Sequence, residues 1–154
     1  YDQPDPILEN EKYRFSEYAI KNFNGYSLRE FGESLDYMKF QYVLNSPESF
    51  KNCKFEFNKE LCNYDKNNGY LQRITITGNS VEEIINKGES YNLKYIISNE
   101  QRNDFHGFID DIYHQEEKYP YLKKIFDSSN QGFKKLKIKV FEIDYEKFNK
   151  LLNE

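Results

Sequence analysis

The sequence predicts one α/β domain of three layers, in which a Rossmann-like, mixed and largely parallel sheet lies between helices on both faces. The first reason is a strand–helix–strand unit between residues 71 and 98. The strand "LQRITITG" alternates apolar and polar residues, and "LKYIIS" is a second strand that begins at Leu93. Such a unit requires a right-handed crossover, and we expect its two strands to pair in parallel.

The second reason is that the sequence contains capping signals where helices would begin. "SVEE" is a capping box, in which Ser80 caps the amide of Glu83 while the Glu83 carboxylate reaches back. "KKLKIKVFEID" (134–144) is a third strand, after which Asp144 caps a final helix. The residues of that helix that we expect to face inward are Tyr145, Phe148, Leu151 and Leu152.

The N-terminal third is less regular. Apolar spacing predicts a helix at 8–23, with Gly25 as its left-handed cap, followed by a short strand at 26–31. A second helix is predicted at 33–44, from the spacing of Leu35, Met38 and Tyr42.

The remaining elements follow from turn residues and alternation. Ser46 is a candidate N-cap, residues 53–58 alternate as a strand, and residues 63–70 are dense in turn formers. A helix is expected at 103–115. After the break at Tyr119-Pro120, a short helix is expected to carry Leu122, Ile125 and Phe126.

Composition supports a folded domain and disfavours nucleic acid as a partner. The 154 residues fit one domain, and 14 Tyr with 13 Phe provide apolar area despite a hydrophobic share of 38%. With 22 Lys and Arg against 26 Asp and Glu, the formal charge is −4. One basic cluster is present, and we interpret it as the solvated face of a strand: Lys134, Lys135, Lys137 and Lys139.

Cys53 and Cys62 are too few for a disulfide scaffold. One bridge is compatible with an oxidising compartment, but their spacing does not require it, and two free thiols are the preferred interpretation. No stretch approaches the roughly 18 apolar residues of a membrane span, and no signal peptide is visible.

The segment "DFHGFIDDIYH" contains ligand-type residues at helical spacing: His106, Asp110 and His114. In a helix, however, the two histidines would lie about 12 Å apart along the axis, too far for one metal ion. A structural role is therefore preferred. Gly78 precedes a helix N-terminus without the further glycines of a phosphate-binding loop, and no cofactor is expected.

Tyr113, Tyr119 and Tyr121 lie in the run "YHQEEKYPY", where aromatic rings accompany carboxylates and amides. Exposed rings of this kind can stack on sugar faces. The alternative, which we prefer, is that they pack a helix break against the sheet.

Two longer segments carry a family resemblance. "VEEIINKGESYNLKYIISNE", followed by "FIDDIYHQEEKYPYLKKIFDSSNQGFKKLKIKVFEIDY", resembles the C-terminal soluble domain of archaeal multispanning membrane glycosyltransferases. Those enzymes are similar to the dolichyl-phosphate-mannose–protein mannosyltransferases. The likeness lies in residues 93–97, 119–128 and 137–145, with weaker support from 13–25, whereas residues 45–70 depart from the pattern.

In that family the acidic catalytic residues lie on an extracytoplasmic loop between membrane helices, and the donor is a lipid-linked sugar. The resemblance implies no catalytic residue here. It implies a domain on the extracytoplasmic face, tethered by upstream transmembrane helices, that covers the active site or presents the acceptor. Its partners would be the membrane portion of the same protein and a glycan or acceptor polypeptide.

We interpret residues 1–154 as a single domain excised from a larger membrane protein, because the chain starts without Met and residues 1–7 resemble a linker. The main alternative is a free-standing carbohydrate- or small-ligand-binding module. A small cytosolic enzyme with a pocket around His106 and Asp110 is a third possibility.

Overall fold

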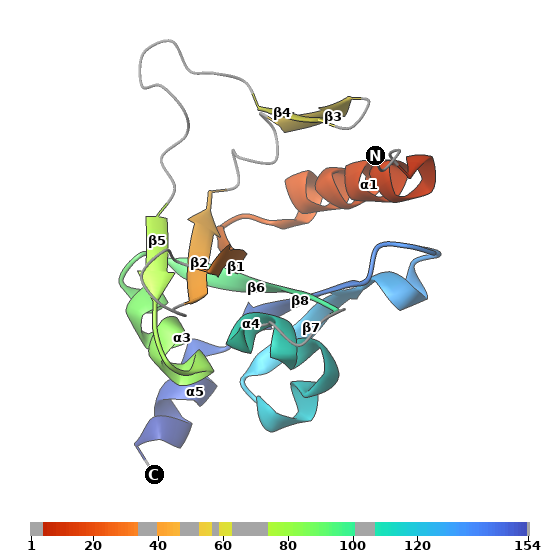
Figure 1. Cartoon of the computed structure of the whole chain (residues 1–154). Helices are drawn as coiled ribbons and strands as arrows, with labels where there is room; N and C mark the ends of the chain where they lie inside the picture. The colour runs from red at the N-terminus through yellow and green to blue at the C-terminus, as the bar shows by residue number, and fades with distance from the viewer. Residues whose placement is uncertain are drawn as a thin grey trace.

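A computed structural model describes residues 5–33, 40–46, 53–56, 59–62, 74–100 and 107–153; residues 31–33, 40–41, 53–56 and 59–62 are described by their backbone alone. The helices and strands, shown in Figure 1, are α1 (Pro6–Asn22), β1 (Tyr26–Glu33), β2 (Phe40–Asn45), β3 (Cys53–Glu56), β4 (Lys59–Cys62), β5 (Ile74–Thr77), α3 (Val81–Glu89), β6 (Leu93–Asn99), α4 (Phe108–Asp111), β7 (Leu122–Asp127), β8 (Ile138–Ile143) and α5 (Tyr145–Leu152). Short 3-10 turns occur at Ile112–His114, Glu116–Lys118 and Ser128–Asn130.

The main sheet has six strands in the order β5-β2-β1-β6-β8-β7. Only β1 and β6 pair in parallel among its described pairings, and the other four pairings are antiparallel. The prediction of an α/β domain with a mixed sheet is confirmed, but the expectation of a largely parallel, Rossmann-like sheet is wrong. β5 and β6 precede and follow α3 along the chain, as expected. The expected parallel pairing of these two strands is wrong, because β2 and β1 lie between them in the sheet.

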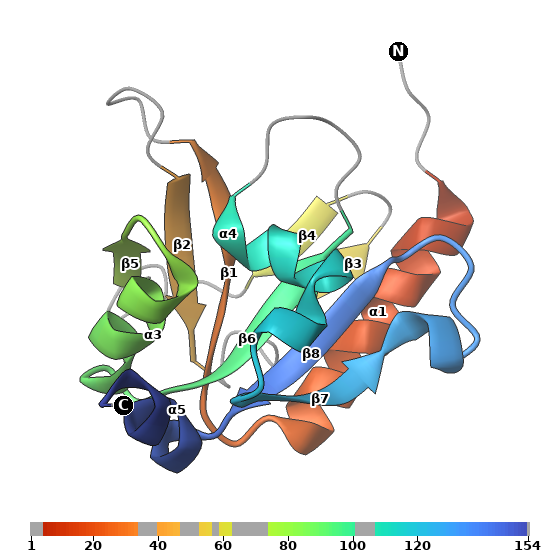
Figure 2. The same ribbon diagram turned by 90° about the horizontal axis from the view of Figure 1, so that it is seen from below.

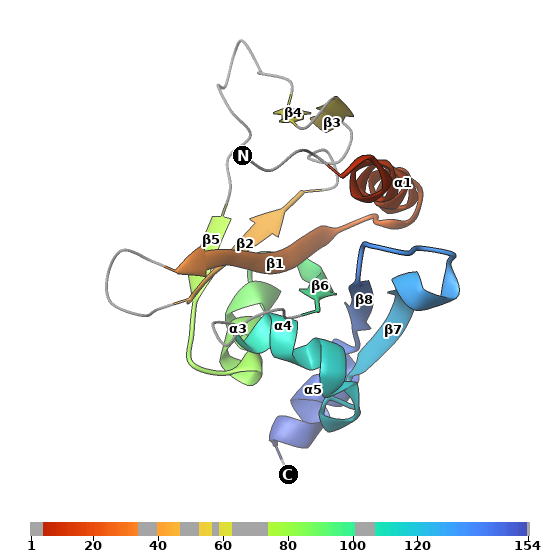
Figure 3. The same ribbon diagram turned by 45° about the vertical axis from the view of Figure 1, so that its right-hand side comes forward.

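Helices cover both faces of the sheet. Figure 3 shows α1 on one side and α3, α4 and α5 on the other, and Figure 2 looks onto the face that carries these three helices. The α1 face packs Phe15, Ala19 and Phe23 against β6, β7 and β8. The opposite face contains the larger apolar cluster, which includes Leu28, Ile84 and Phe148.

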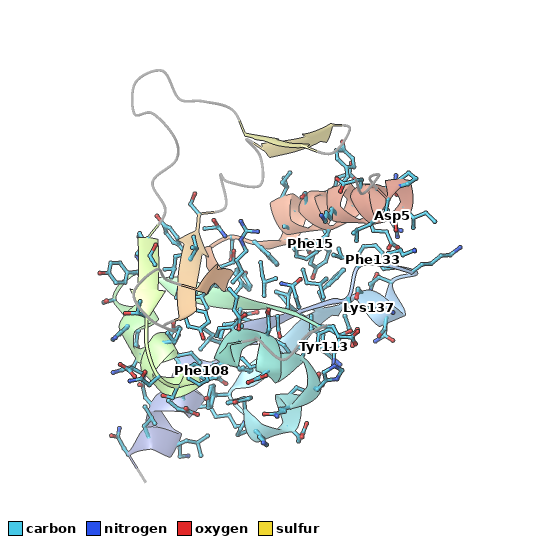
Figure 4. All side chains as sticks on the ribbon, in the orientation of Figure 1. Asp5, Phe15, Phe108, Tyr113, Phe133 and Lys137 are labelled. Atoms are coloured by element: carbon cyan, nitrogen blue, oxygen red, sulfur yellow. The ribbon has the colours of Figure 1, made fainter. Side chains whose placement is uncertain are left out.

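Side chains follow the same division. In Figure 4, Phe15 and Phe133 lie between α1 and the sheet, whereas Phe108 and Tyr113 lie on the side of α4. Phe15 and Phe126 of β7 contact each other edge to face, with ring centroids 5.4 Å apart. Phe23 stacks on Tyr95 of β6 at 4.7 Å. The first helix and the residue that follows it are thus held by strands from the second half of the chain.

A buried carboxylate completes the attachment of α1. Glu11, only 3% exposed, accepts hydrogen bonds from the backbone amides of Lys134, Lys135 and Leu136. These amides belong to the connection between β7 and β8, so one side chain of the first helix organises the loop before the last strand.

The predicted helix caps are largely confirmed. Ser80 Oγ accepts a hydrogen bond from the amide of Glu83 at 3.1 Å, and the Glu83 carboxylate reaches the amide of Asn79 instead of that of Ser80. Asp144 caps α5 through the amide of Lys147 at 3.0 Å. Of the four residues expected to face inward in α5, Phe148 is fully buried and Tyr145 packs against the core, whereas Leu151 and Leu152 are 39% and 49% exposed.

Two helix predictions are wrong because of strand geometry. Within the predicted helix at 33–44, residues 40–45 form β2; residues 34–39 lie outside the described part. β2 is a central strand whose residues 42–45 are all buried, so its continuous apolar run shows no strand alternation.

The predicted helix at 122–126 is strand β7. Its pairing with β8 shifts register between Lys124 and Phe126, which breaks the two-residue alternation. The apolar residues consequently fall at positions 122, 125 and 126, a spacing that resembles a helix. The expected left-handed cap at Gly25 is also wrong, since α1 ends at an extended Phe23.

β3 and β4 form a separate two-stranded hairpin. It lies beside α1 and away from the main sheet (Figure 1), and β3 contacts α1. The strand predicted at 53–58 is confirmed for residues 53–56, while the loop predicted at 63–70 lies outside the described residues.

Candidate functional site

Three polar side chains meet where the two parallel strands end. Glu30 lies near the carboxyl end of β1, directly opposite Tyr42 of β2, and Asp110 comes from α4, which follows β6. We call Glu30, Tyr42 and Asp110 the Glu30 cluster. In open α/β sheets, ligands bind outside the carboxyl ends of parallel strands, and this is the corresponding position here.

The cluster attaches α4 to the sheet through backbone amides. The amide of Asp110 donates to Glu30 Oε1 at 3.0 Å, and the amide of Phe108 donates to Tyr42 Oη at 3.1 Å. In return, Asp110 Oδ1 accepts from the amide of Asn99, the last residue of β6, at 2.9 Å. The Glu30 cluster therefore connects β1, β2 and β6 to α4 through hydrogen bonds.

Gly107 allows this close approach. A Cβ atom at this position would lie 2.6 Å from Glu30 Oε1 and 2.6 Å from Tyr42 Oη, closer than real Cβ contacts. The backbone angles of Gly107 are extended and accessible to any residue, so the requirement for glycine is one of space.

The two carboxyl groups of the cluster interact unfavourably when both are ionised. Burial raises the pKa of Glu30 to about 7, and the neighbouring carboxyl group of Asp110 contributes through its charge and a hydrogen bond. Hydrogen bonds from the backbone amides of Asp110 and Gly107 lower the pKa of Glu30, but they do not offset these effects. Near neutral pH, Glu30 therefore exchanges between protonated and ionised forms.

Tyr42 stays protonated across the physiological range. It is fully buried, and burial together with the charges of Glu30 and Asp110 raises its pKa. Its hydroxyl serves as a fixed polar contact. Glu30 and Asp110, which are only partly buried, are the members that solvent can reach. A carboxyl group that titrates near neutral pH can donate a hydrogen bond to a ligand when it is protonated and accept one when it is ionised.

Of the predicted set His106, Asp110 and His114, the two described members, Asp110 and His114, do not share one helix. α4 ends at Asp111 and a 3-10 turn follows, so the expected helix at 103–115 is much shorter in the described residues; His106 lies outside them. His114 is 63% exposed and its Nε2 is 3.5 Å from a carboxylate oxygen of Glu100. Of the three, the structure places Asp110 in the cluster.

The tyrosines follow the packing interpretation. Tyr113 and Tyr121 are buried, and Tyr119 packs against the core while partly exposed. The hydroxyl of Tyr121 donates to Glu82 Oε1 at 3.0 Å, and its ring meets Phe148 edge to face at 4.9 Å. Burial raises the pKa of Tyr113 and Tyr119. The rings of Tyr113 and Tyr121 are not presented as a stacking surface.

Lys139 does not lie on the solvated strand face that was predicted for the basic cluster. Its Nζ lies 4.3 Å from the centre of the Tyr113 ring and donates to the Tyr113 carbonyl at 2.7 Å. It also pairs with Glu116 at 2.9 Å, and its side chain is only 15% exposed. This lysine holds the turn after α4 against β8.

Glu30 and Tyr42 were missed by reasoning from the sequence. Glu30 is two residues after the buried Leu28 and shares its face of the strand, so a charged residue at an inward position was the available signal. Tyr42 was assigned to a helix, which hid its pairing with β1.

Within the described ranges, no group of three or more His, Cys, Asp and Glu residues could hold a metal ion. No described helix has the length and hydrophobicity of a transmembrane helix. No protein-family model, curated protein or solved structure matches the chain.

Proposed function

We propose that this chain is the extramembrane domain of a membrane glycosyltransferase that uses a lipid-linked sugar donor, and that it covers the active site or presents the acceptor. It would lie on the extracytoplasmic face, next to the membrane portion of the same protein. The sugar-transfer chemistry would belong to that membrane portion.

The observation that supports this proposal is the location of the resemblance in the fold. Its three segments correspond to β6, to β7 with the turn before it, and to β8, which are adjacent in the order β6-β8-β7. The weaker segment at 13–25 includes most of α1, whose apolar face packs on these same strands. These segments therefore form one packed unit of the fold.

In this proposal, the Glu30 cluster is the part of the domain that contacts the acceptor. An acceptor side chain or glycan presents hydroxyl groups, which both donate and accept hydrogen bonds. Glu30 and Asp110 are partly exposed, and a Glu30 carboxyl with a pKa of about 7 can donate a hydrogen bond when protonated and accept one when ionised, which suits a group of that kind. In this role the cluster would bind the acceptor and take no part in bond breaking.

The first test is the reading frame upstream of Tyr1. Several segments of about 20 apolar residues are expected there, as membrane helices require. A start codon directly before Tyr1, without such segments, would overturn the proposal and leave a free-standing ligand-binding module.

The second test uses the full-length protein with a polyprenyl-phosphate sugar and an acceptor peptide. We expect Glu30→Gln to raise the KM for the acceptor severalfold while kcat and the KM for the donor stay unchanged. Glu142→Gln, an exchange of the same kind on β8, serves as the control. An unchanged acceptor KM would remove the cluster from the proposal, and loss of kcat would contradict a binding role.

A further inference from the structure

The two cysteines occupy directly opposed positions in the hairpin of β3 and β4. The register pairs Cys53 with Cys62 at the open end of the ladder and Glu56 with Lys59 at the closed end. Directly opposed Cα atoms in an antiparallel pair are about 4.5–5.5 Å apart. Disulfides span Cα separations of about 4.4–6.8 Å, whereas diagonal neighbours at about 7–8 Å lie outside this range.

The phase of the ladder favours the same pair. Opposed residues alternate between hydrogen-bonded pairs and closer, non-hydrogen-bonded pairs. Two residues connect Glu56 to Lys59, and in hairpins of this length the flanking pair is hydrogen-bonded. Counting three pairs back from it, Cys53 and Cys62 form a non-hydrogen-bonded pair, with the shorter Cα separation of about 4.5 Å.

The hairpin has less support than the strands of the main sheet, although β3 contacts α1. Each of its strands has four residues, and they pair only with each other among the described strands. An isolated two-stranded hairpin is marginally stable in water. A covalent link at the open end would close the ladder opposite its turn.

We propose that Cys53 and Cys62 form an intramolecular disulfide. One cysteine thiolate attacks a small-molecule disulfide such as oxidised glutathione, which forms a mixed disulfide and releases one glutathione thiolate. The second cysteine thiolate attacks the mixed disulfide and releases the second glutathione. The two cysteines lose two electrons and two protons, and glutathione disulfide is reduced to two thiols.

This inference replaces the interpretation of the two cysteines as free thiols. It rests on the hairpin register and is independent of the proposed function. The extracytoplasmic location in that proposal would supply an oxidising compartment, where such bridges persist.

The test equilibrates the purified chain with reduced and oxidised glutathione at a series of ratios. Remaining thiols are alkylated, and the products are identified by intact mass and peptide mapping. We expect the bridged form, lighter than the reduced chain by two hydrogen atoms, to predominate well before glutathione adducts appear. Two alkylated thiols, or adducts on both cysteines, at the oxidising end would overturn the proposal.

A register control separates hairpin geometry from short chain separation. Cys62→Ser combined with Leu61→Cys moves one thiol out of register and to the other face of the hairpin. The equilibrium constant for bridge formation should fall by about tenfold or more. Residues on opposite faces of a ladder have Cβ atoms that point apart, and a disulfide cannot join them without backbone movement. Adding Cys53→Ser and Lys54→Cys restores direct opposition and should recover bridge formation. Equal oxidation of the register variant and the natural chain would overturn the disulfide proposal. This result does not depend on the tests of the proposed glycosyltransferase function.

Discussion

Each face of the sheet contains a carboxyl group that accepts backbone amides, fully buried for Glu11 and partly buried for Glu30, and the pKa values of the two groups shift in opposite directions. On the α1 face, Glu11 is surrounded by donors. Burial acts to raise its pKa, but the amides of Lys134, Lys135 and Leu136 hold the pKa below its ordinary value. On the α4 face, Glu30 also accepts amides, yet the neighbouring Asp110 adds a second carboxyl group, and its pKa rises.

The difference shows that burial alone does not decide the charge of a carboxyl group. Three donors without a competing charge keep Glu11 ionised at neutral pH, where it organises a loop. A similar side chain next to another acid becomes a group that changes protonation near neutral pH. The first arrangement is typical of a structural role, and the second is more often found at binding and catalytic sites.

The largest effect should come from Glu11→Ala. Three backbone amides would lose a charged acceptor, and the free energy of unfolding should fall by about 3–5 kcal/mol. Denaturant titration measures this. The matched control is Glu9→Ala on the same helix, whose pair with Lys12 is long at 3.6 Å; it should cost about 0.5 kcal/mol or less. A loss below about 1 kcal/mol for Glu11→Ala would mean that the amides find other acceptors.

Gly107→Ala should come next, because its Cβ atom would overlap two oxygens of the Glu30 cluster. We expect a loss of about 1–3 kcal/mol in thermal or chemical unfolding, as for overpacked cores. The loss should become smaller in a Glu30→Ala background, where part of the obstruction is gone. Strict additivity of the two changes would show that Gly107 is needed for another reason.

The pH dependence of stability should separate the two carboxyl groups. Glu30 has a raised pKa, so its contribution is fully present below its ordinary pKa of 4.5 and is lost as the pH rises to about 7. Glu11 has a lowered pKa, so its contribution is present above that ordinary value and is lost as the pH falls further. The two slopes therefore have opposite signs.

Glu30→Gln isolates the first slope, since glutamine resembles the protonated form. At pH 8 the variant should be more stable than the natural chain by on the order of 2 kcal/mol, and at pH 4 the two should be equal. Urea titrations across this range measure both. If the variant and the natural chain had the same free energy of unfolding at every pH, the raised pKa of Glu30 would be contradicted.

The smallest effect is expected for Tyr42→Phe. The ring stays in the core, but the amide of Phe108 loses its acceptor, which should cost about 1 kcal/mol. Hydrogen exchange should be faster at the Phe108 amide, while the amide of Leu44 on the same strand stays protected. Unchanged exchange at Phe108 would show that water or another group replaces the hydroxyl.

The sequence allowed prediction of elements whose signals are local. Ser80 and Asp144 mark helix starts through bonds to amides three residues away, and α1, β5, β6 and β8 have clear periodicity. β2 and β7 could not be recognised, because the first is buried at each of its residues 42–45 and the second contains a register shift.

The candidate site depended on contacts that periodicity does not contain. Glu30 and Asp110 are eighty residues apart, and Tyr42 and Phe108 are sixty-six apart. Asp110 was identified by residue type alone. Its partners depended on the strand order β2-β1-β6, and this order follows from pairing across the domain.

The attachment of α1 also affects how the domain can fold. Glu11 binds amides more than 120 residues later in the chain, and Arg14 donates to the carbonyl of Gln131. During synthesis, the first helix emerges long before the strands and loop that bury it. Contacts of such long sequence separation slow folding and leave apolar surface exposed in the meantime. We therefore expect folding to begin in the C-terminal hairpin of β7 and β8 and to end with the docking of α1.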